Sequence, residues 1–146
     1  MIKNGILLVE DDDLDVISVE RSLKKIGLDS NLYTAYNGIE ALNLLDTLAN
    51  RSITIPEVIL LDMNMPKMNG IEFLRKLRND ERFKHLKVFV MTTSNDENER
   101  KEAETLGISG YLIKPLNFND NSKRNASMDY FMHFHLLKII NDNKIN

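Results

Sequence analysis

The chain has 146 residues, a formal net charge of −3 and no cysteine, so we expect one domain, no disulfide or thiol chemistry, and oxygen ligands for any bound metal. No apolar run approaches the roughly 20 residues of a membrane span, and the N-terminus lacks a signal-peptide pattern, which predicts a cytoplasmic protein that does not bind membranes. The negative charge, without a dense run of Lys or Arg, disfavours direct binding to nucleic acid.

Five short runs rich in apolar, β-branched and aromatic residues predict strands, and helical patterns lie between them. In chain order we predict strands over residues 6–9, 32–35, 58–61, 88–91 and 111–113, alternating with helices over 14–26, 38–50, 70–80, 96–106 and 126–140. The strands lack a clean alternation of polar residues, which indicates that helices cover both faces of a parallel sheet. The predicted fold class is therefore α/β.

Acidic residues follow two of the predicted strands at their carboxyl ends, where an open parallel α/β sheet binds ligands. Glu10 and Asp11 follow the first strand, and Asp62 follows the third. Three carboxylates this close repel one another and raise one another's pKa unless a cation keeps them ionised. Mg²⁺ is the natural cation, because it prefers oxygen ligands and keeps several of its waters.

Thr92 and Lys114 follow the fourth and fifth strands and add a hydroxyl and an ammonium to the same edge of the sheet. This set suits phosphoryl transfer to a carboxylate, a reaction that depends on positioning and on neutralising the charge of the phosphoryl oxygens. Asp62 would be the nucleophile. Lys114 and Mg²⁺ would supply positive charge, and Thr92 would donate a hydrogen bond to a phosphoryl oxygen.

Five segments together resemble the signature of response-regulator receiver domains (CheY-like) in their order and spacing. They are Leu8-Val9-Glu10-Asp11-Asp12, Leu61-Asp62-Met63-Asn64-Met65-Pro66, Met68-Asn69-Gly70, Met91-Thr92-Thr93-Ser94 and Gly110-Tyr111-Leu112-Ile113-Lys114-Pro115. The resemblance covers about residues 5 to 116. It implies a flavodoxin-like, doubly wound, five-stranded parallel sheet in the order 2-1-3-4-5, with helices on both faces.

The resemblance implies which residues hold the metal and control the phosphoryl group. Asp62 would be the phosphoacceptor and, with Asp11 and the backbone carbonyl of Asn64, a direct ligand of Mg²⁺, for which Mn²⁺ is a substitute. Glu10 would act through a water molecule. Asn64 and Ser94 occupy the two positions that tune autodephosphorylation in the family. Because Ser94 carries neither a carboxylate nor an amide, we expect no strong water-positioning group there.

The resemblance also implies a switch that responds to phosphorylation. The hydroxyl of Thr92 would move toward the phosphoryl group, and the ring of Tyr111 would turn inward into the space that Thr92 vacates. Lys114 would pair with the phosphate, and the peptide bond before Pro115 would be cis. The protein would catalyse its own phosphorylation and dephosphorylation and act as a signalling switch.

The partners implied are a sensor histidine kinase or a histidine phosphotransfer protein as phosphodonor, and an unidentified downstream protein, because no effector domain follows. Residues 80–84 and 92–94 resemble the single-domain subgroup that pairs with bacterial phytochrome-type sensor kinases. Ile17 lies beside the apolar stripe of the first helix, and we expect Ile17 and Leu116 to contact the kinase, with local packing as the alternative. We expect Asp13 and Asp15 to be solvated.

The predicted organisation is a single receiver domain over residues 1–146, with an atypical polar segment over 117–125 and an apolar last helix over about 126–141. Apolar residues are scattered around most of the circumference of that helix, so one face of a sheet cannot bury them all. We expect a homodimer through this helix, most simply with two-fold symmetry. A displaced or swapped helix is the alternative.

Two other functions fit part of this pattern. A Mg²⁺-dependent phosphohydrolase with an aspartyl nucleophile would usually place a second acid two residues after the first, and here that residue is Asn64. A binding module that works without phosphorylation would not need the complete set of polar residues at the strand ends. We therefore expect a phosphoacceptor response regulator of a two-component or phosphorelay system.

Overall fold

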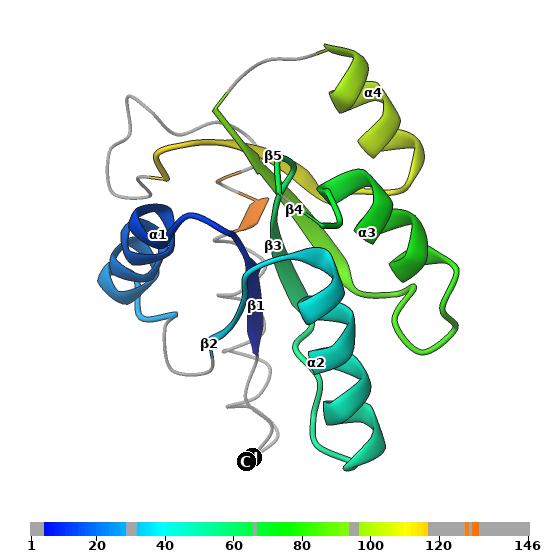
Figure 1. Cartoon of the computed structure of the whole chain (residues 1–146). Coiled ribbons are helices and arrows are strands. Elements are labelled where there is room, and N and C mark those ends of the chain that lie inside the picture. The colour runs from blue at the N-terminus through cyan, green and yellow to red at the C-terminus, as the bar shows by residue number, and fades with distance from the viewer. Residues whose placement is uncertain are drawn as a thin grey trace.

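Helices lie on both faces of a parallel sheet in this computed structural model (Figure 1), which describes residues 5–28, 32–65, 67–93, 97–116, 128, 130 and 131. The elements are β1 Ile6–Val9, α1 Asp13–Lys25, β2 Leu32–Ala35, α2 Gly38–Asn50, β3 Val58–Asp62, α3 Gly70–Arg78, β4 Lys87–Thr92, α4 Glu97–Thr105 and β5 Gly110–Ile113. The elements predicted up to residue 113 are thus confirmed, with ends that differ by one or two residues. The polar segment 117–125 lies outside the described residues.

The sheet has the strand order β2-β1-β3-β4-β5, and every neighbouring pair is parallel. This confirms the flavodoxin-like topology. All residues of β1 and β3 are buried, which explains why these strands show no alternation of polar residues in the sequence. In the register, Val9 lies opposite Leu61, and Thr92 lies opposite Ile113. The residues that follow these strands are therefore placed at one common edge.

Two apolar clusters hold the helices on the sheet, one on each face. On one face, α1 contributes Val16, Val19 and Leu23, which pack with alternate residues of the central strands. On the other face lie α2, α3 and α4, which Figure 1 shows together across the sheet from α1. Of α4 only Ala103 is buried, so this helix has little apolar contact with the domain.

Arg78, at the end of α3, fixes the end of α4 by hydrogen bonds. Its Nε donates to the carbonyl of Leu106 at 2.8 Å, and its Nη2 donates to the carbonyl of Gly107 at 2.8 Å. Its Nη1 donates to the carbonyls of Lys84 and Leu86, at 2.9 and 2.8 Å, in the loop before β4. A planar guanidinium suits this task, since its five N–H donors diverge in one plane.

Met128, Tyr130 and Phe131 are helical, and the rest of the predicted last helix lies outside the described residues. Met128 and Phe131 are buried in the cluster on the α1 face, and the Phe131 ring meets that of Phe89 edge-on at 5.1 Å between centroids. At least these two apolar residues pack on the sheet of the same chain. Within the described part of the chain, no helix has the length and apolar character needed to cross a membrane.

Candidate phosphoacceptor and metal site

Three carboxylates converge beyond the carboxyl ends of β1 and β3. Oxygen atoms of Glu10, Asp11 and Asp62 lie within 4.8 Å of one another. Glu10 and Asp62 are buried, and Asp11 is exposed. The predicted convergence is therefore confirmed, although Asp62 is the last residue of β3 rather than the first after it.

Backbone groups fix two of these carboxylates. The N–H of Asp12 donates to Glu10 Oε1 at 3.2 Å, and the N–H of Asn64 donates to Asp62 Oδ1 at 3.3 Å. Asp12 also begins α1, because its carboxylate accepts the N–H groups of Leu14 and Asp15 at 2.8 and 3.1 Å. The start of the helix is thereby positioned beside the acids.

Gly70 allows the loop after β3 to fold closely against the base of the site. Its N–H donates to the carbonyl of Met63 at 3.1 Å. A Cβ at this position would lie 2.8 Å from the Cα of Met63 and 3.0 Å from the carbonyl oxygen of Asp62. Backbone atoms cannot move aside as a side chain can, so this close approach requires glycine at position 70.

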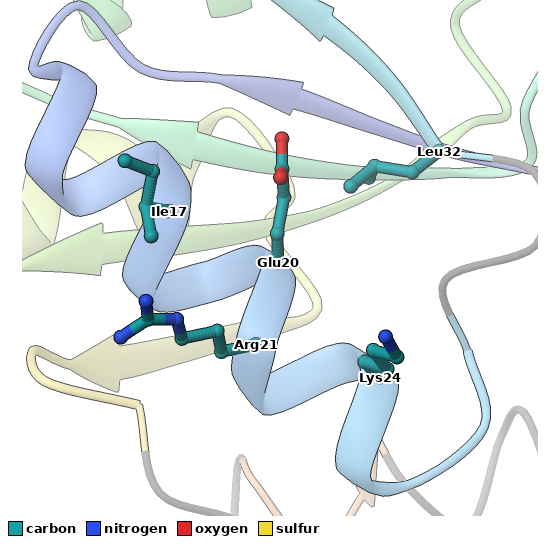
Figure 2. Close-up of a pocket in the computed structure, with 5 residues that line it drawn as sticks. All are labelled: Ile17, Glu20, Arg21, Lys24 and Leu32. Carbon is teal, nitrogen blue, oxygen red and sulfur yellow. The ribbon is translucent and has the colours of Figure 1, made fainter.

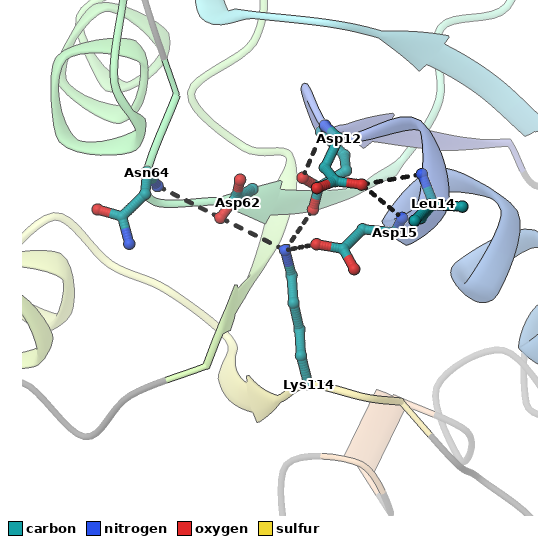
Figure 3. A network of polar contacts seen from close by, with 7 residues as sticks. Asp12, Leu14, Asp15, Asp62, Asn64 and Lys114 are labelled. Carbon is teal, nitrogen blue, oxygen red and sulfur yellow. Dashed lines mark hydrogen bonds and ion pairs between the residues drawn. The ribbon is translucent and has the colours of Figure 1, made fainter.

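Lys114 brings positive charge into the cluster (Figure 3). Its Nζ lies 2.5 Å from Glu10 Oε2, 3.0 Å from Asp15 Oδ2 and 3.6 Å from Asp62 Oδ1. The prediction that Asp15 is solvated is confirmed only in part: its side chain is 42% exposed, but its carboxylate is paired with the ammonium. This pairing was not predicted, because Lys114 is distant in sequence and is brought to α1 only by the fold.

Burial makes this cluster electrostatically unfavourable for the negative charges it holds. Burial raises the pKa of Glu10 to about 7, the hydrogen bond from Lys114 opposes this, and the charge of Asp62 adds to it. Burial likewise raises the pKa of Asp62, against the opposing charge of Lys114. For Lys114, burial acts against the charged form, but the hydrogen bonds to Glu10 and Asp15 and the charges of Asp62 and Glu10 together raise the pKa.

The donor set fits a hard divalent cation. The three side chains offer only oxygen atoms, and two of the three are buried acids whose pKa values are raised. One ammonium does not balance this cluster, and an added cation would favour the ionised carboxylates. The residues that could hold it are Glu10, Asp11 and Asp62. The backbone carbonyl of Asn64 as a further ligand stays a prediction.

Thr92 and Tyr111 lie on the neighbouring strands. Thr92 ends β4 and is buried, and its carbonyl accepts the N–H of Lys114 at 2.8 Å, which ties the ends of β4 and β5 together. Tyr111 is buried in the cluster on the α4 side, with the guanidinium of Arg100 at 5.2 Å from its ring centroid. The Lys114–Pro115 peptide bond is cis, as predicted. Ser94 lies outside the described residues.

The two residues predicted to contact a kinase differ in exposure. Ile17 is 44% exposed and lines a shallow surface pocket with Glu20, Arg21, Lys24 and Leu32 (Figure 2). Leu116 is only 3% exposed and belongs to the apolar cluster on the α1 face. Its predicted part in a docking surface is therefore wrong for this structure, because the turn after β5 directs its side chain into the core.

Asp15, Arg78 and Arg100 acquire roles that the sequence reasoning missed. For Asp15 a pattern was available: helices that follow parallel strands begin at the carboxyl edge of the sheet, so an acid in the first turn of α1 lies near the site. For Arg78 and Arg100 we find no comparable pattern. The four carbonyl groups that Arg78 contacts and the ring beside Arg100 are brought to them by packing.

Comparison with known proteins gives a consistent assignment. Residues 6–125 match the family described as response regulator receiver domain. The response regulator Rcp1 of Synechocystis sp. is 32% identical over 127 residues, which are 86% of each chain. The crystal structure of the Mn²⁺-bound form of Rcp1 matches with a TM-score of 0.69 and 33% identity, over 79% of this chain and 84% of that one.

Two further solved structures extend over nearly the whole chain. A two-component response regulator from Legionella pneumophila is 40% identical, with a TM-score of 0.71, and the match covers 90% of this chain and 98% of that one. The bacteriophytochrome response regulator AtBRR is 29% identical, with a TM-score of 0.75, over 93% of this chain and 94% of that one. On the strength of the family match, the strand order and the polar residues at the strand ends, this chain belongs to the response-regulator receiver domains of two-component systems.

Proposed function

We propose that this chain accepts a phosphoryl group on Asp62 from a sensor histidine kinase or a histidine phosphotransfer protein, and that it signals through protein contacts. The observation that carries the proposal is a buried Asp62 whose carboxylate lies 3.6 Å from the ammonium of Lys114 and within 4.8 Å of two further acids. A buried nucleophilic carboxylate flanked by a lysine and a cation site is the arrangement that acyl-phosphate formation requires.

A divalent cation, Mg²⁺ or Mn²⁺, would be held by Glu10, Asp11 and Asp62, with the carbonyl of Asn64 as a further ligand. When bound, it would neutralise charge on the acids and on the incoming phosphoryl oxygens. The oxygen-only cluster supports this assignment. So does the Mn²⁺-bound form of Rcp1, a similar protein whose structure contains that metal.

The chain's own groups then have separate tasks. A carboxylate oxygen of Asp62 attacks phosphorus, forming an O–P bond while the N–P bond of the donor phosphohistidine breaks and the imidazole leaves. The ammonium of Lys114 stabilises a phosphoryl oxygen, and the hydroxyl of Thr92 donates to another. In the switch, Thr92 moves toward the phosphoryl group and Tyr111 follows inward. Asn64 and Ser94 tune the later hydrolysis.

The phosphoacceptor role is tested by incubating the purified protein with Mg²⁺ and phosphoramidate and locating the modified residue by mass spectrometry. The expected result is a single acyl phosphate on Asp62 that does not form in EDTA. Asp62→Asn should abolish it, whereas Asp13→Asn, a change of an exposed acid nearby, should leave it intact. An acyl phosphate that persists in Asp62→Asn contradicts the proposal. Turnover of small phosphate esters would instead support a phosphohydrolase.

We place the kinase contact on the exposed face of α1. Ile17, Glu20, Arg21 and Lys24 recur at helical spacing on this face and line the pocket beside β2 (Figure 2). An apolar side chain rimmed by charged ones suits a helical partner. The likeness to the bacteriophytochrome response regulator AtBRR supports a kinase of the bacterial phytochrome type.

Ile17→Lys is expected to slow phosphoryl transfer from the cognate kinase while leaving the reaction with phosphoramidate unchanged. Ile39→Lys is a matched control, because Ile39 is also 44% exposed but lies on α2, across the sheet. Equal transfer from the kinase to both variants and to the unmodified protein would rule out this face.

The predicted homodimer through the last helix stays a proposal. Tyr130 is exposed next to the buried Met128 and Phe131, so this turn of the helix has both an inner and an outer face. Light scattering at micromolar concentration, with and without phosphorylation, distinguishes a dimer from a monomer.

A further inference from the structure

The ammonium of Lys114 is shared by three carboxylates, and one of them stands apart from the metal cluster. Glu10 and Asp62 belong to that cluster, whereas Asp15 does not. Asp15 Oδ2 nevertheless lies 3.0 Å from Nζ, well within hydrogen-bond distance. In Figure 3 its carboxylate reaches the ammonium from α1, while Asp62 approaches from β3. The Lys114 side chain is 9% exposed and that of Asp15 is 42% exposed, so the pair joins a buried cation to an anion at the rim.

In the proposed function, the other two carboxylates have tasks that compete with their pairing to Lys114. Glu10 and Asp62 would serve a bound cation, and Asp62 would also carry the phosphoryl group. An ammonium has three N–H donors, and a buried one is stable only with hydrogen-bonded counter-charges. While Glu10 and Asp62 are engaged, Asp15 is still able to accept a hydrogen bond from Lys114. Without Asp15, the ammonium of Lys114 would depend more on its hydrogen bond to Glu10, and it would compete with the cation for that carboxylate.

We infer that Asp15 is a positioning residue, whose carboxylate holds the Lys114 ammonium at the mouth of the site, ready to meet a phosphoryl oxygen on Asp62. The inference rests on the proposed function of Asp62. Glu10, Asp11 and Asp62 would bind the cation, whereas Asp15 orients the lysine. Asp15 touches neither the reacting oxygen nor phosphorus, so its effect must pass through Lys114.

The test measures the initial rate of Asp62 phosphorylation by phosphoramidate, at Mg²⁺ concentrations that saturate each variant. Asp15→Ala is expected to lower this rate by about fivefold, the size expected for one charge-assisted hydrogen bond to a half-exposed partner. Asp15→Glu, which keeps a carboxylate within reach, should recover most of the rate. Asp13→Ala is the matched control, because it removes an equal charge from the same first turn of α1. It should behave as the unmodified protein.

A double-mutant comparison separates positioning from a general loss of charge. In a Lys114→Met background the rate is expected to be low, and adding Asp15→Ala should lower it no further. If the alanine variant fails to fold, Asp15→Asn keeps the side-chain shape and should show the same loss. An unchanged rate in Asp15→Ala, or an equal loss with and without Lys114, overturns the inference. If the unmodified protein gains no phosphate on Asp62, the proposed function itself is wrong. If the unmodified protein and Asp15→Ala are phosphorylated at the same rate, only the inference about Asp15 is wrong.

Discussion

Glu10→Gln is expected to stabilise the metal-free protein above pH 7, although it removes one partner of an ion pair. Burial raises the pKa of Glu10 from 4.5 to about 7, so the hydrogen bond from Lys114 does not compensate for lost hydration. Between these two values the unfolded chain has released the proton and the folded protein has kept it. Stability therefore falls as the pH rises from 4.5 to about 7 and stays reduced above that. Glutamine has nearly the same shape and never ionises.

The size of the effect follows from the two pKa values. The difference between 4.5 and about 7 corresponds to about 3 kcal/mol of unfolding free energy at pH 8, at roughly 1.4 kcal/mol for each tenfold change in the proton equilibrium. At pH 4.5 the folded protein is almost fully protonated at Glu10 and the unfolded chain is half protonated, so the gain should be below about 0.5 kcal/mol.

Urea unfolding in EDTA, followed by circular dichroism at pH 4.5 and pH 8, measures both quantities. Glu20→Gln is the control, because Glu20 is an exposed acid on α1, and its replacement should change stability little at either pH. Added Mg²⁺ should stabilise the unmodified protein more than Glu10→Gln. The reasoning is refuted if Glu10→Gln is less stable than the unmodified protein at pH 8, or if the gain is equal at the two pH values.

Two further substitutions test the packing around the site. Arg78→Met should lower the free energy of unfolding by about 2 to 4 kcal/mol in urea denaturation, because the carbonyl groups at the end of α4 lose their hydrogen-bond donor. Arg75→Met, which breaks only an exposed ion pair, should cost less than about 1 kcal/mol, and equal losses would contradict the capping role. Gly70→Ala should destabilise by about 1 to 3 kcal/mol and slow phosphorylation, because a Cβ would meet the backbone of residues 62–63. The three atoms nearest to a Cβ at Gly38 all belong to the side chain of Met68 rather than to backbone, so Gly38→Ala should cost less by the same measurement, and the opposite ranking would refute the steric argument.

Local patterns were enough to predict the order of the elements. Short apolar runs and helical periodicity are properties of neighbouring residues, and each predicted element in the described part of the chain is present to within one or two residues at its ends. A parallel sheet also has a fixed polarity. Residues that follow different strands therefore meet at one edge, which placed Glu10, Asp62, Thr92 and Lys114 together before any distance was known.

The prediction of which side chains face solvent was less successful. Leu116 is predicted at the surface but lies in the core, and Asp15 is partly exposed but also paired with Lys114, 99 residues away. No periodic pattern indicates the burial of Leu116, and the first-turn position of Asp15 indicates only that it lies near the site, not which residue it pairs with. The direction of one side chain after a turn, or the meeting of two distant ones, depends on how the elements pack, and this packing has no signature within a short window of sequence.

The sequence by itself determined the βα alternation, the parallel sheet and the identity of the polar residues at its carboxyl edge, because these follow from residue type and spacing. Only the tertiary structure decided which acid is buried, which is exposed and which acids lie beside the lysine. Glu10 and Asp11 are adjacent in the chain, but one is removed from water and the other is not. Desolvation and ion pairing depend on distances between segments far apart in sequence, and those distances exist only once the chain is folded.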